Sequence, residues 1–282
     1  QLTTALTWGM QTNARTLQSI DFHNWTEAFR TLPIRDLDLA AGRRLDFWQD
    51  WLEHACYDDY WEAFSVAHRW HEIRVPAFNM GGWYDLFIRD TFLTFNALRA
   101  YGATPESRQS RLIVGPWPHR LAESTRTGDV DFGVGSLVNL DHLERRWFNQ
   151  WLKDDDDGLS KEPPLRLFIM GANEWRDEHE WPLARTHWQT WYLHSNGNAN
   201  SARGDGTLSL SAPGEEPADA FVYDPRFPVQ SLGGTTCCNP EIVLWGPHDQ
   251  RPVEARSDVL CYTTTPLRED LEITGPITLV LH

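Results

Sequence analysis

Residues 75–102 have the sequence VPAFNMGGWYDLFIRDTFLTFNALRAYG, a short apolar run followed by a helical pattern. The run ends at a double glycine, which predicts a buried strand closed by a turn. From Phe87 onward, apolar side chains recur at three- and four-residue spacing as far as Gly102, a residue type that commonly ends helices. The run RLIVG at 111–115 predicts a second strand. Strand, helix and strand with short connections predict parallel strands in an α/β sheet.

The pattern continues on both sides of this unit. Downstream, DHLERRWFNQWLK predicts an amphipathic helix in which Asp141 and Glu144 have the spacing of a capping box. PPLRLFIMG, at 163–171, predicts one more strand with its prolines at the start. Upstream, the chain as far as about residue 70 predicts packed helices. Beyond about residue 186, short apolar or alternating segments lie between Gly, Pro, Asn and Ser clusters, and they predict the strands of a sandwich or jelly roll at 187–193, 221–224, 257–264 and 271–281.

The amino-acid composition limits which binding partners and which cellular location are expected. The chain has 282 residues, 15 tryptophans and a formal charge of −15, which predicts a large core and disfavours nucleic acid as a partner. The sequence contains no apolar run of about 18 residues, so no membrane span is predicted. Cys56, Cys237, Cys238 and Cys261 match no zinc pattern or disulfide framework, so free thiols and a reducing, cytoplasmic location are expected. No signal peptide is recognisable, but the chain does not start with methionine, so a leader stays open.

An acid and a histidine follow the two neighbouring strands at equivalent places. Asp85 comes just after the first strand, and His119 comes just after the second, in LIVGPWPH. The carboxyl ends of strands are where sites form in open α/β sheets. An acid followed by a histidine matches the last two members of the Ser, Asp/Glu, His order of α/β-hydrolases. Taken alone, these two residues are more often explained by a turn aspartate and an unrelated histidine.

The nucleophile of such a triad is not recognisable in this chain. A nucleophile elbow needs G-x-S-x-G between a strand and a helix, before the acid. Ser19 and Ser65 precede Asp85 but lack the glycines, and Ser136 comes after it. The serine is therefore expected to lie outside the chain. No HExxH or similar spacing occurs, so we predict neither a metal site nor a cofactor.

Several blocks together resemble the cocaine esterase/non-D hydrolase group, of the Xaa-Pro dipeptidyl-peptidase superfamily of serine hydrolases. The blocks are VPAFNMGGWYDLF, RLIVGPWPH, LERRWFNQWLK, LRLFIMGANEWRDEHEWP, YDPRFPVQSLGG and DVLCYTTTPLREDLEITGP. The resemblance implies an α/β-hydrolase domain, a helical cap and a C-terminal jelly roll. This chain would then carry part of the cap at 1–68, the second part of the hydrolase sheet at 69–185, and the first jelly-roll strands at 186–282. The elbow serine and the tyrosine of the oxyanion hole would lie upstream.

The resemblance also implies a substrate class. Relatives that hydrolyse α-amino acid esters carry acids shortly after the catalytic aspartate, where this chain has Phe87 and Ile88. A small ester or amide with an apolar acyl group is therefore expected. Trp83 and Tyr84 would support the site, although plain core aromatics explain them equally well.

By the same analogy, the loop after SLGG in the jelly roll approaches the acyl pocket. Thr236, Cys237 and Cys238 would then line that pocket. The expected function is thus a segment of a serine esterase or amidase, with Asp85 and His119 as its catalytic residues. The alternatives are a non-catalytic cap and jelly-roll binding module, or an inactive gene fragment. An upstream reading frame that encodes the elbow would favour the enzyme, and a homo-oligomer is compatible with each alternative.

Overall fold

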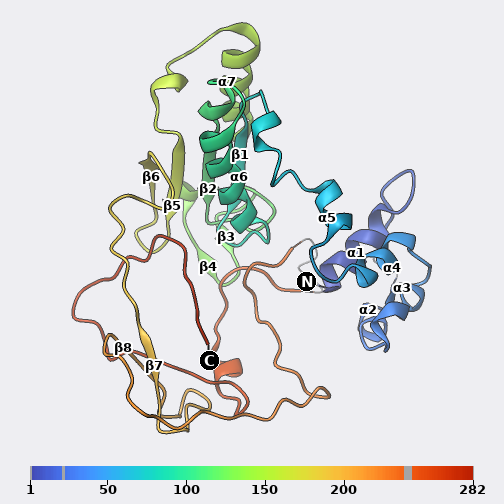
Figure 1. The fold of residues 1–282 in the computed structure, drawn as a ribbon, viewed down its shortest axis with the longest axis vertical. Helices are drawn as coiled ribbons and strands as arrows, with labels where there is room; N and C mark the ends of the chain where they lie inside the picture. Colours follow the sequence, from blue (N-terminus) through green and yellow to red (C-terminus); the bar gives the residue numbers. More distant parts are fainter. Residues whose placement is uncertain (1, 21–22, 238–242, 282) are drawn as a thin grey trace.

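The structure is a computed structural model that describes residues 2–20, 23–237 and 243–281. It comprises a helical lobe, a sheet with helices, and an extended C-terminal region (Figure 1). The predicted α/β fold class is confirmed. The three predicted domain boundaries stay a prediction.

The helical lobe is built by the first helices of the chain. Their bounds are α1 Leu2–Thr12, α2 Trp25–Ala28, α3 Leu37–Ala40, α4 Asp46–Glu53 and α5 Asp59–Phe64. Trp48 of α4 is buried against Leu6 of α1 in an apolar core. The carboxylate of Asp38 is also buried there, and it accepts hydrogen bonds from the backbone amides of Leu39 and Leu45 at 2.8 and 2.9 Å. These donors offset the cost of burying the charge.

The central sheet has the strand order β1-β2-β5-β6. Its strands are β1 Phe78–Gly82, β2 Arg111–Gly115, β5 Leu165–Ile169 and β6 Glu174–Glu178. The first three are parallel, as predicted, and β6 is antiparallel to β5. The strand β6 was not predicted, because EWRDE lacks an apolar strand pattern. This strand is held instead by its pairing with β5 and by the Trp175 ring, 5.3 Å from that of Phe168.

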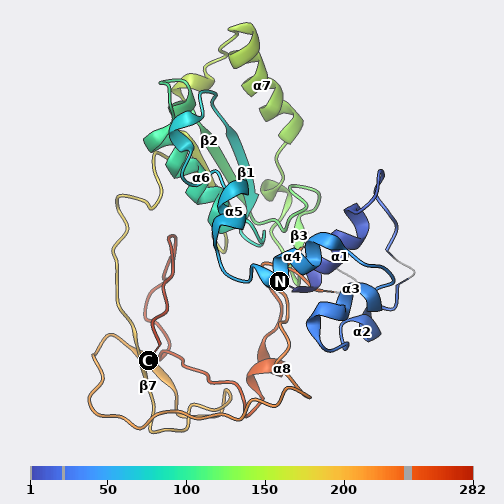
Figure 2. The ribbon, with the colours of Figure 1, turned by 45° about the vertical axis from the view of Figure 1, so that its right-hand side comes forward.

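Two long helices, α6 Ile88–Tyr101 and α7 Leu140–Lys153, pack on this sheet (Figure 2). Phe95 of α6 is fully buried in a cluster with Val114 of β2. On α7, the ring of Trp147 lies 5.7 Å from that of Phe78, and the same side chain borders a small cavity beside Ile113. Successive strand residues point to opposite faces, so Val114 and Ile113 place α6 and α7 on different sides of the sheet.

The capping box predicted for α7 is wrong. The helix begins at Leu140, and its N-cap is Asn139, whose side-chain oxygen accepts from the backbone amide of His142 at 2.9 Å. Asp141 therefore lies inside the first turn. Its carboxylate still interacts favourably with the helix dipole there.

The C-terminal region contains fewer strands than predicted. The remaining strands and α-helix are β3 Arg126–Thr127, β4 Val130–Asp131, β7 Tyr192–His194, β8 Thr207–Ser209 and α8 Arg251–Glu254. After residue 186, the described residues form the β7–β8 pair and isolated bridges, whereas the predicted strands at 221–224 and 271–281 do not form. A strand needs a neighbour for its backbone groups. Side chains such as those of Val222 and Ile277 are instead 82% exposed.

The described cysteines differ in whether they form a disulfide bond. Cys56 and Cys261 are free thiols, as expected. Cys237 is disulfide-bonded, so the expectation of free thiols is wrong for this residue.

Candidate active site

The paired ends of β1 and β2 bring Asp85 and His119 together. Gly82 and Gly115, the last residues of the two strands, are register partners. The pairing continues beyond them, because the Trp83 amide donates to the Gly115 carbonyl at 2.8 Å. Asp85 Oδ2 lies 3.0 Å from His119 Nδ1, which is hydrogen-bonding distance. This contact agrees with the expectation that residues after two neighbouring parallel strands lie close together.

The carboxylate of Asp85 is held from two sides. Its Oδ1 accepts from the Phe87 amide at 2.9 Å, and its Oδ2 faces His119 Nδ1. The Asp85 side chain is 6% exposed, whereas that of His119 is 43% exposed. A neutral imidazole that donates from Nδ1 keeps the lone pair on Nε2. The exposed ring can therefore accept a proton at Nε2 while the buried carboxylate fixes its orientation.

The loop that carries His119 is anchored by Trp117. This indole is buried, and its Nε1 donates to the Ser136 carbonyl at 3.1 Å. The Pro116 carbonyl accepts from the Thr127 hydroxyl at 2.8 Å. Gly82 allows the close approach of the two strand ends, since a Cβ there would lie 2.0 Å from the Trp117 carbonyl oxygen.

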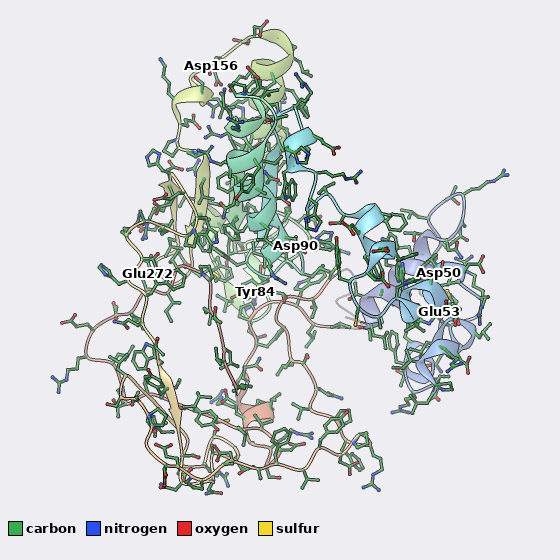
Figure 3. All side chains as sticks on the ribbon, in the orientation of Figure 1. Asp50, Glu53, Tyr84, Asp90, Asp156 and Glu272 are labelled. Carbon is green, nitrogen blue, oxygen red and sulfur yellow. The ribbon has the colours of Figure 1, made fainter. Side chains whose placement is uncertain are left out.

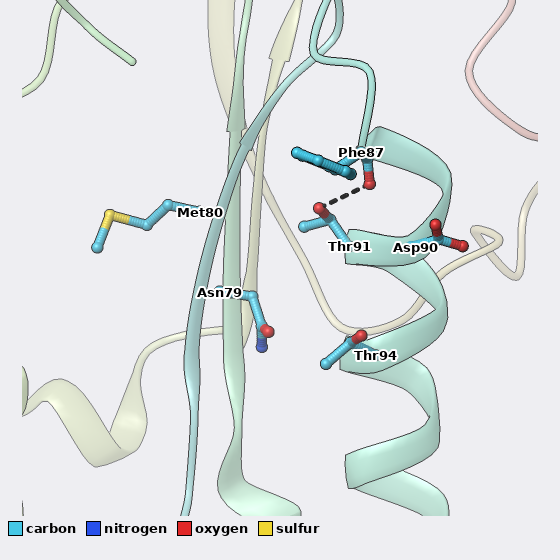
Figure 4. A pocket seen from close by; sticks show the side chains of 6 residues that line it. All are labelled: Asn79, Met80, Phe87, Asp90, Thr91 and Thr94. Atoms are coloured by element: carbon cyan, nitrogen blue, oxygen red, sulfur yellow. Dashed lines mark hydrogen bonds between the residues drawn. The ribbon is translucent and has the colours of Figure 1, made fainter. Parts of the chain in front are cut away.

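Phe87 borders both the histidine and a cavity. Its ring meets that of His119 edge to face, with 5.3 Å between centroids, and the side chain is 49% exposed. A cavity of about 260 Å³ lies between β1 and α6, lined by Asn79, Met80, Phe87, Asp90, Thr91 and Thr94 (Figure 4). The Thr91 hydroxyl donates to the Phe87 carbonyl at 2.9 Å and holds the start of α6. The cavity was not foreseen, because its lining joins a strand and a helix whose facing sides depend on packing.

The aromatic neighbours of Asp85 have different surroundings. Trp83 has the contacts of a core side chain: its Nε1 donates to the Phe168 carbonyl at 2.7 Å, and its ring packs on Phe92. Ile88 also packs against this core. Tyr84 is half-buried at the lower end of the sheet, near the centre of Figure 3. Burial raises the pKa of its phenol above the usual value.

The loop after SLGG is partly described. Thr236 is buried and its hydroxyl donates to the Leu244 carbonyl at 2.6 Å. Cys237 is 4% exposed. Cys238 lies outside the described residues. The predicted contacts of these residues with an acyl group stay a prediction.

The described part of the chain lacks both a metal-binding cluster and a membrane-spanning helix. No group of three or more His, Cys, Asp or Glu side chains there is arranged to hold a metal ion. None of the described helices combines the length and the apolarity needed to cross a bilayer.

Comparisons with known proteins agree along most of the chain. Residues 2–120 match the family model for X-Pro dipeptidyl-peptidase (S15 family), and residues 157–282 match its C-terminal non-catalytic domain. The cocaine esterase of Rhodococcus sp. (strain MB1 Bresler) is 38% identical over 229 residues, which is 80% of this chain and 38% of that protein. The chain belongs to the CocE/NonD hydrolase family.

A solved structure extends this finding to the fold. An aminopeptidase from a marine sediment archaeon, Thaumarchaeota archaeon, superposes with a TM-score of 0.72 at 20% identity. The match covers 95% of this chain and 44% of the aminopeptidase. This member of the CocE/NonD family thus spans less than half the length of both proteins.

Proposed function

We propose that this chain supplies the acid and the base of a Ser-His-Asp triad in a serine hydrolase that cleaves esters or amides. The observation that carries the proposal is the 3.0 Å contact between His119 Nδ1 and Asp85 Oδ2 at the ends of two paired parallel strands. Family membership supports the same chemistry, and the name of the Rhodococcus relative supports esters as substrates.

The proposed roles follow from the geometry of the pair. His119 Nε2 accepts the proton of the serine hydroxyl as its oxygen attacks the substrate carbonyl carbon, and then gives that proton to the leaving group. Asp85 stays ionised, fixes the tautomer of the imidazole and stabilises the imidazolium. Phe87 contacts His119 and is half exposed, which suits an apolar acyl group at this position. The serine comes from a segment outside this chain, since no G-x-S-x-G precedes Asp85.

The proposal is tested in the complete protein encoded by the gene that contains this chain. Asp85→Asn and His119→Ala should each lower kcat/KM for para-nitrophenyl butanoate by about 10⁴-fold, as in other triads. Asp141→Asn and His142→Ala are matched controls, because both residues are exposed on α7. Turnover that survives in the first two variants within about tenfold would exclude the assigned roles.

The alternative is a non-catalytic binding module or an inactive fragment. The match of residues 157–282 to a non-catalytic domain makes binding a real alternative for that region. The enzyme hypothesis also requires that residues 1–282 alone have negligible turnover. Hydrolysis by the isolated chain that disappears in Asp85→Asn would show that its nucleophile lies within the chain.

A further inference from the structure

The outer side of β1 is an open edge of the central sheet. In the described part of the chain, β1 pairs with β2 alone. The Trp83 amide, directly after β1, donates to the Gly115 carbonyl of β2 at 2.8 Å. Because alternate residues of a strand face the same neighbour, the odd-numbered residues of β1 bond to β2. The amide and carbonyl groups of Phe78 and Met80 therefore point outward, and no described residue pairs with them.

The two edges of the sheet differ in charge. At the other edge, β6 has the sequence EWRDE, and its Arg176 donates to the two carboxylate oxygens of Glu272 at 2.7 and 3.1 Å. Charged side chains and a covering segment are common protections of an edge strand against further pairing. β1 has the sequence FNMGG, which contains no charged residue. The edge of β1 thus has the features of a pairing site, whereas that of β6 is protected.

A groove lies beside this open edge. It is the cavity of about 260 Å³ between β1 and α6, and its lining includes Met80 of the strand and Thr94 of the helix. Figure 4 shows the side chains of Thr91 and Thr94 pointing from α6 toward the strand. Leu93, the neighbour of Thr94, is 51% exposed and does not line the groove. Alternate side chains of a strand placed along β1 would enter this groove.

We infer that the outer edge of β1 and this groove bind a parallel strand of the polypeptide that precedes residue 1 in the complete protein. The chain covers 38% of the Rhodococcus cocaine esterase and 44% of the archaeal aminopeptidase, so more than half of a protein of that length lies outside it. A parallel strand would end at the same edge of the sheet as β1, beside Asp85 and His119. The inference rests on the proposed function, which needs a serine from outside the chain.

Two other occupants of this edge fit the site less well. A second copy of this chain would pair β1 with itself around a two-fold axis, which makes the two strands antiparallel. That arrangement brings no nucleophile elbow to His119, because the chain contains no G-x-S-x-G. A segment that follows residue 282 could pair with β1, but the serine precedes the acid in the order of α/β-hydrolases.

Amide hydrogen exchange, compared between the complete protein and the 282-residue chain, tests the pairing. The Met80 amide should exchange at least about a hundredfold more slowly in the complete protein, because it gains a strand partner there. The Asn79 amide is the internal control, since it faces β2 and should be protected in both proteins. Equal exchange of the Met80 amide in the two proteins would overturn the inference. Protection that already appears in the 282-residue chain and rises with its concentration would assign the edge to a second copy and overturn it as well.

A photo-cross-linker identifies the occupant of the groove in the complete protein. p-Benzoylphenylalanine in place of Thr94 should cross-link to a peptide that precedes residue 1, whereas the same replacement of Leu93 should not. Thr94→Arg should also speed exchange of the Met80 amide at least about tenfold, and Leu93→Arg should change it by less than about twofold. A cross-link from position 94 to residues that follow 282, or to another molecule, would overturn the inference.

These readouts are independent of turnover, so they separate the docking surface from the proposed triad. Protection of the Met80 amide and the cross-link from position 94 should both persist in Asp85→Asn. Hydrolysis that also persists in Asp85→Asn would refute only the proposed triad, whereas an unprotected Met80 amide in an active complete protein would refute only the docking surface.

Discussion

Gly82→Ala should separate the ends of β1 and β2 and thereby misplace the acid of the candidate site. A Cβ at position 82 would lie 2.0 Å from the Trp117 carbonyl oxygen and 2.6 Å from its carbonyl carbon. A Cβ atom essentially never lies within 3.0 Å of such a neighbouring atom. The two backbones must therefore move apart by about 1 Å, the difference between 3.0 and 2.0 Å. The obstructing atoms are backbone, so no side-chain rotation can relieve the contact.

The cost in stability follows from the surroundings of Trp117. Its indole is 1% exposed and bonded to the Ser136 carbonyl, which leaves the loop little room to move. Overpacking of this kind costs about 1–3 kcal/mol. The 3.0 Å hydrogen bond from the Tyr84 amide to Trp117 would also be strained, at a cost of about 1 kcal/mol. We therefore expect the free energy of unfolding to fall by about 2–4 kcal/mol.

The effect on turnover should be larger than the stability loss suggests. Asp85 lies three residues beyond Gly82, and His119 two residues beyond Trp117, so separating the strand ends lengthens the 3.0 Å contact between them. A misplacement of about 1 Å can lower catalysis by about 10²-fold. Reduced kcat with a folded protein is thus expected.

Urea unfolding of the 282-residue chain and kcat/KM of the complete protein measure the two effects. The matched control is Gly214→Ala, because that glycine is exposed and an added Cβ meets nothing within 4 Å. If Gly82→Ala resembles this control in both unfolding free energy and turnover, the close approach of the strand ends does not determine the site geometry.

Two further predictions concern the sheet and the C-terminal region. Phe95→Ala, at a fully buried position of α6, should lower the unfolding free energy by about 3–5 kcal/mol. Leu93→Ala, at a half-exposed position of the same helix, should change the unfolding free energy little. Equal urea midpoints for the two variants would contradict this prediction. The hydrogen bond to Glu216 raises the pKa of His194, so its contribution to stability is present below pH 6.5 and is lost as pH rises through the raised folded value. Amide-exchange protection of Ser195 should follow that loss and become independent of pH in His194→Gln; a decline that persists in this variant would assign it to another group.

The parts of the fold that were predicted correctly depend on local patterns. The apolar run before Gly82 and the spacing along α6 each arise within one segment, so β1, α6 and β2 are visible in the sequence. Their connections also fix the strands as parallel. This is sufficient to place Asp85 beside His119, since residues that follow paired parallel strands meet at one edge of the sheet.

The parts that were missed depend on partners that no local pattern specifies. β6 is a charged segment that becomes a strand because β5 offers an edge. Conversely, the apolar segment at 271–281 is not a strand, because no described neighbour pairs with it. The cap of α7 is a milder case: Asn139 and Asp141 are both good capping residues, and the choice between them depends on where the preceding loop turns.

The same distinction separates the Asp85–His119 pair from the C-terminal segment docked beyond it. The proposed triad chemistry uses Asp85 and His119, whose contact follows from the pairing of β1 with β2. The docking of the C-terminal segment on the β3–β4 hairpin, in contrast, depends on two glycines far apart in the sequence. A Cβ at Gly128 would lie 2.3 Å from the Pro247 carbonyl oxygen, and one at Gly246 would lie 2.6 Å from the Thr127 side chain. Substitution of either glycine should therefore displace the C-terminal segment before it alters the hydrogen bond between Asp85 and His119.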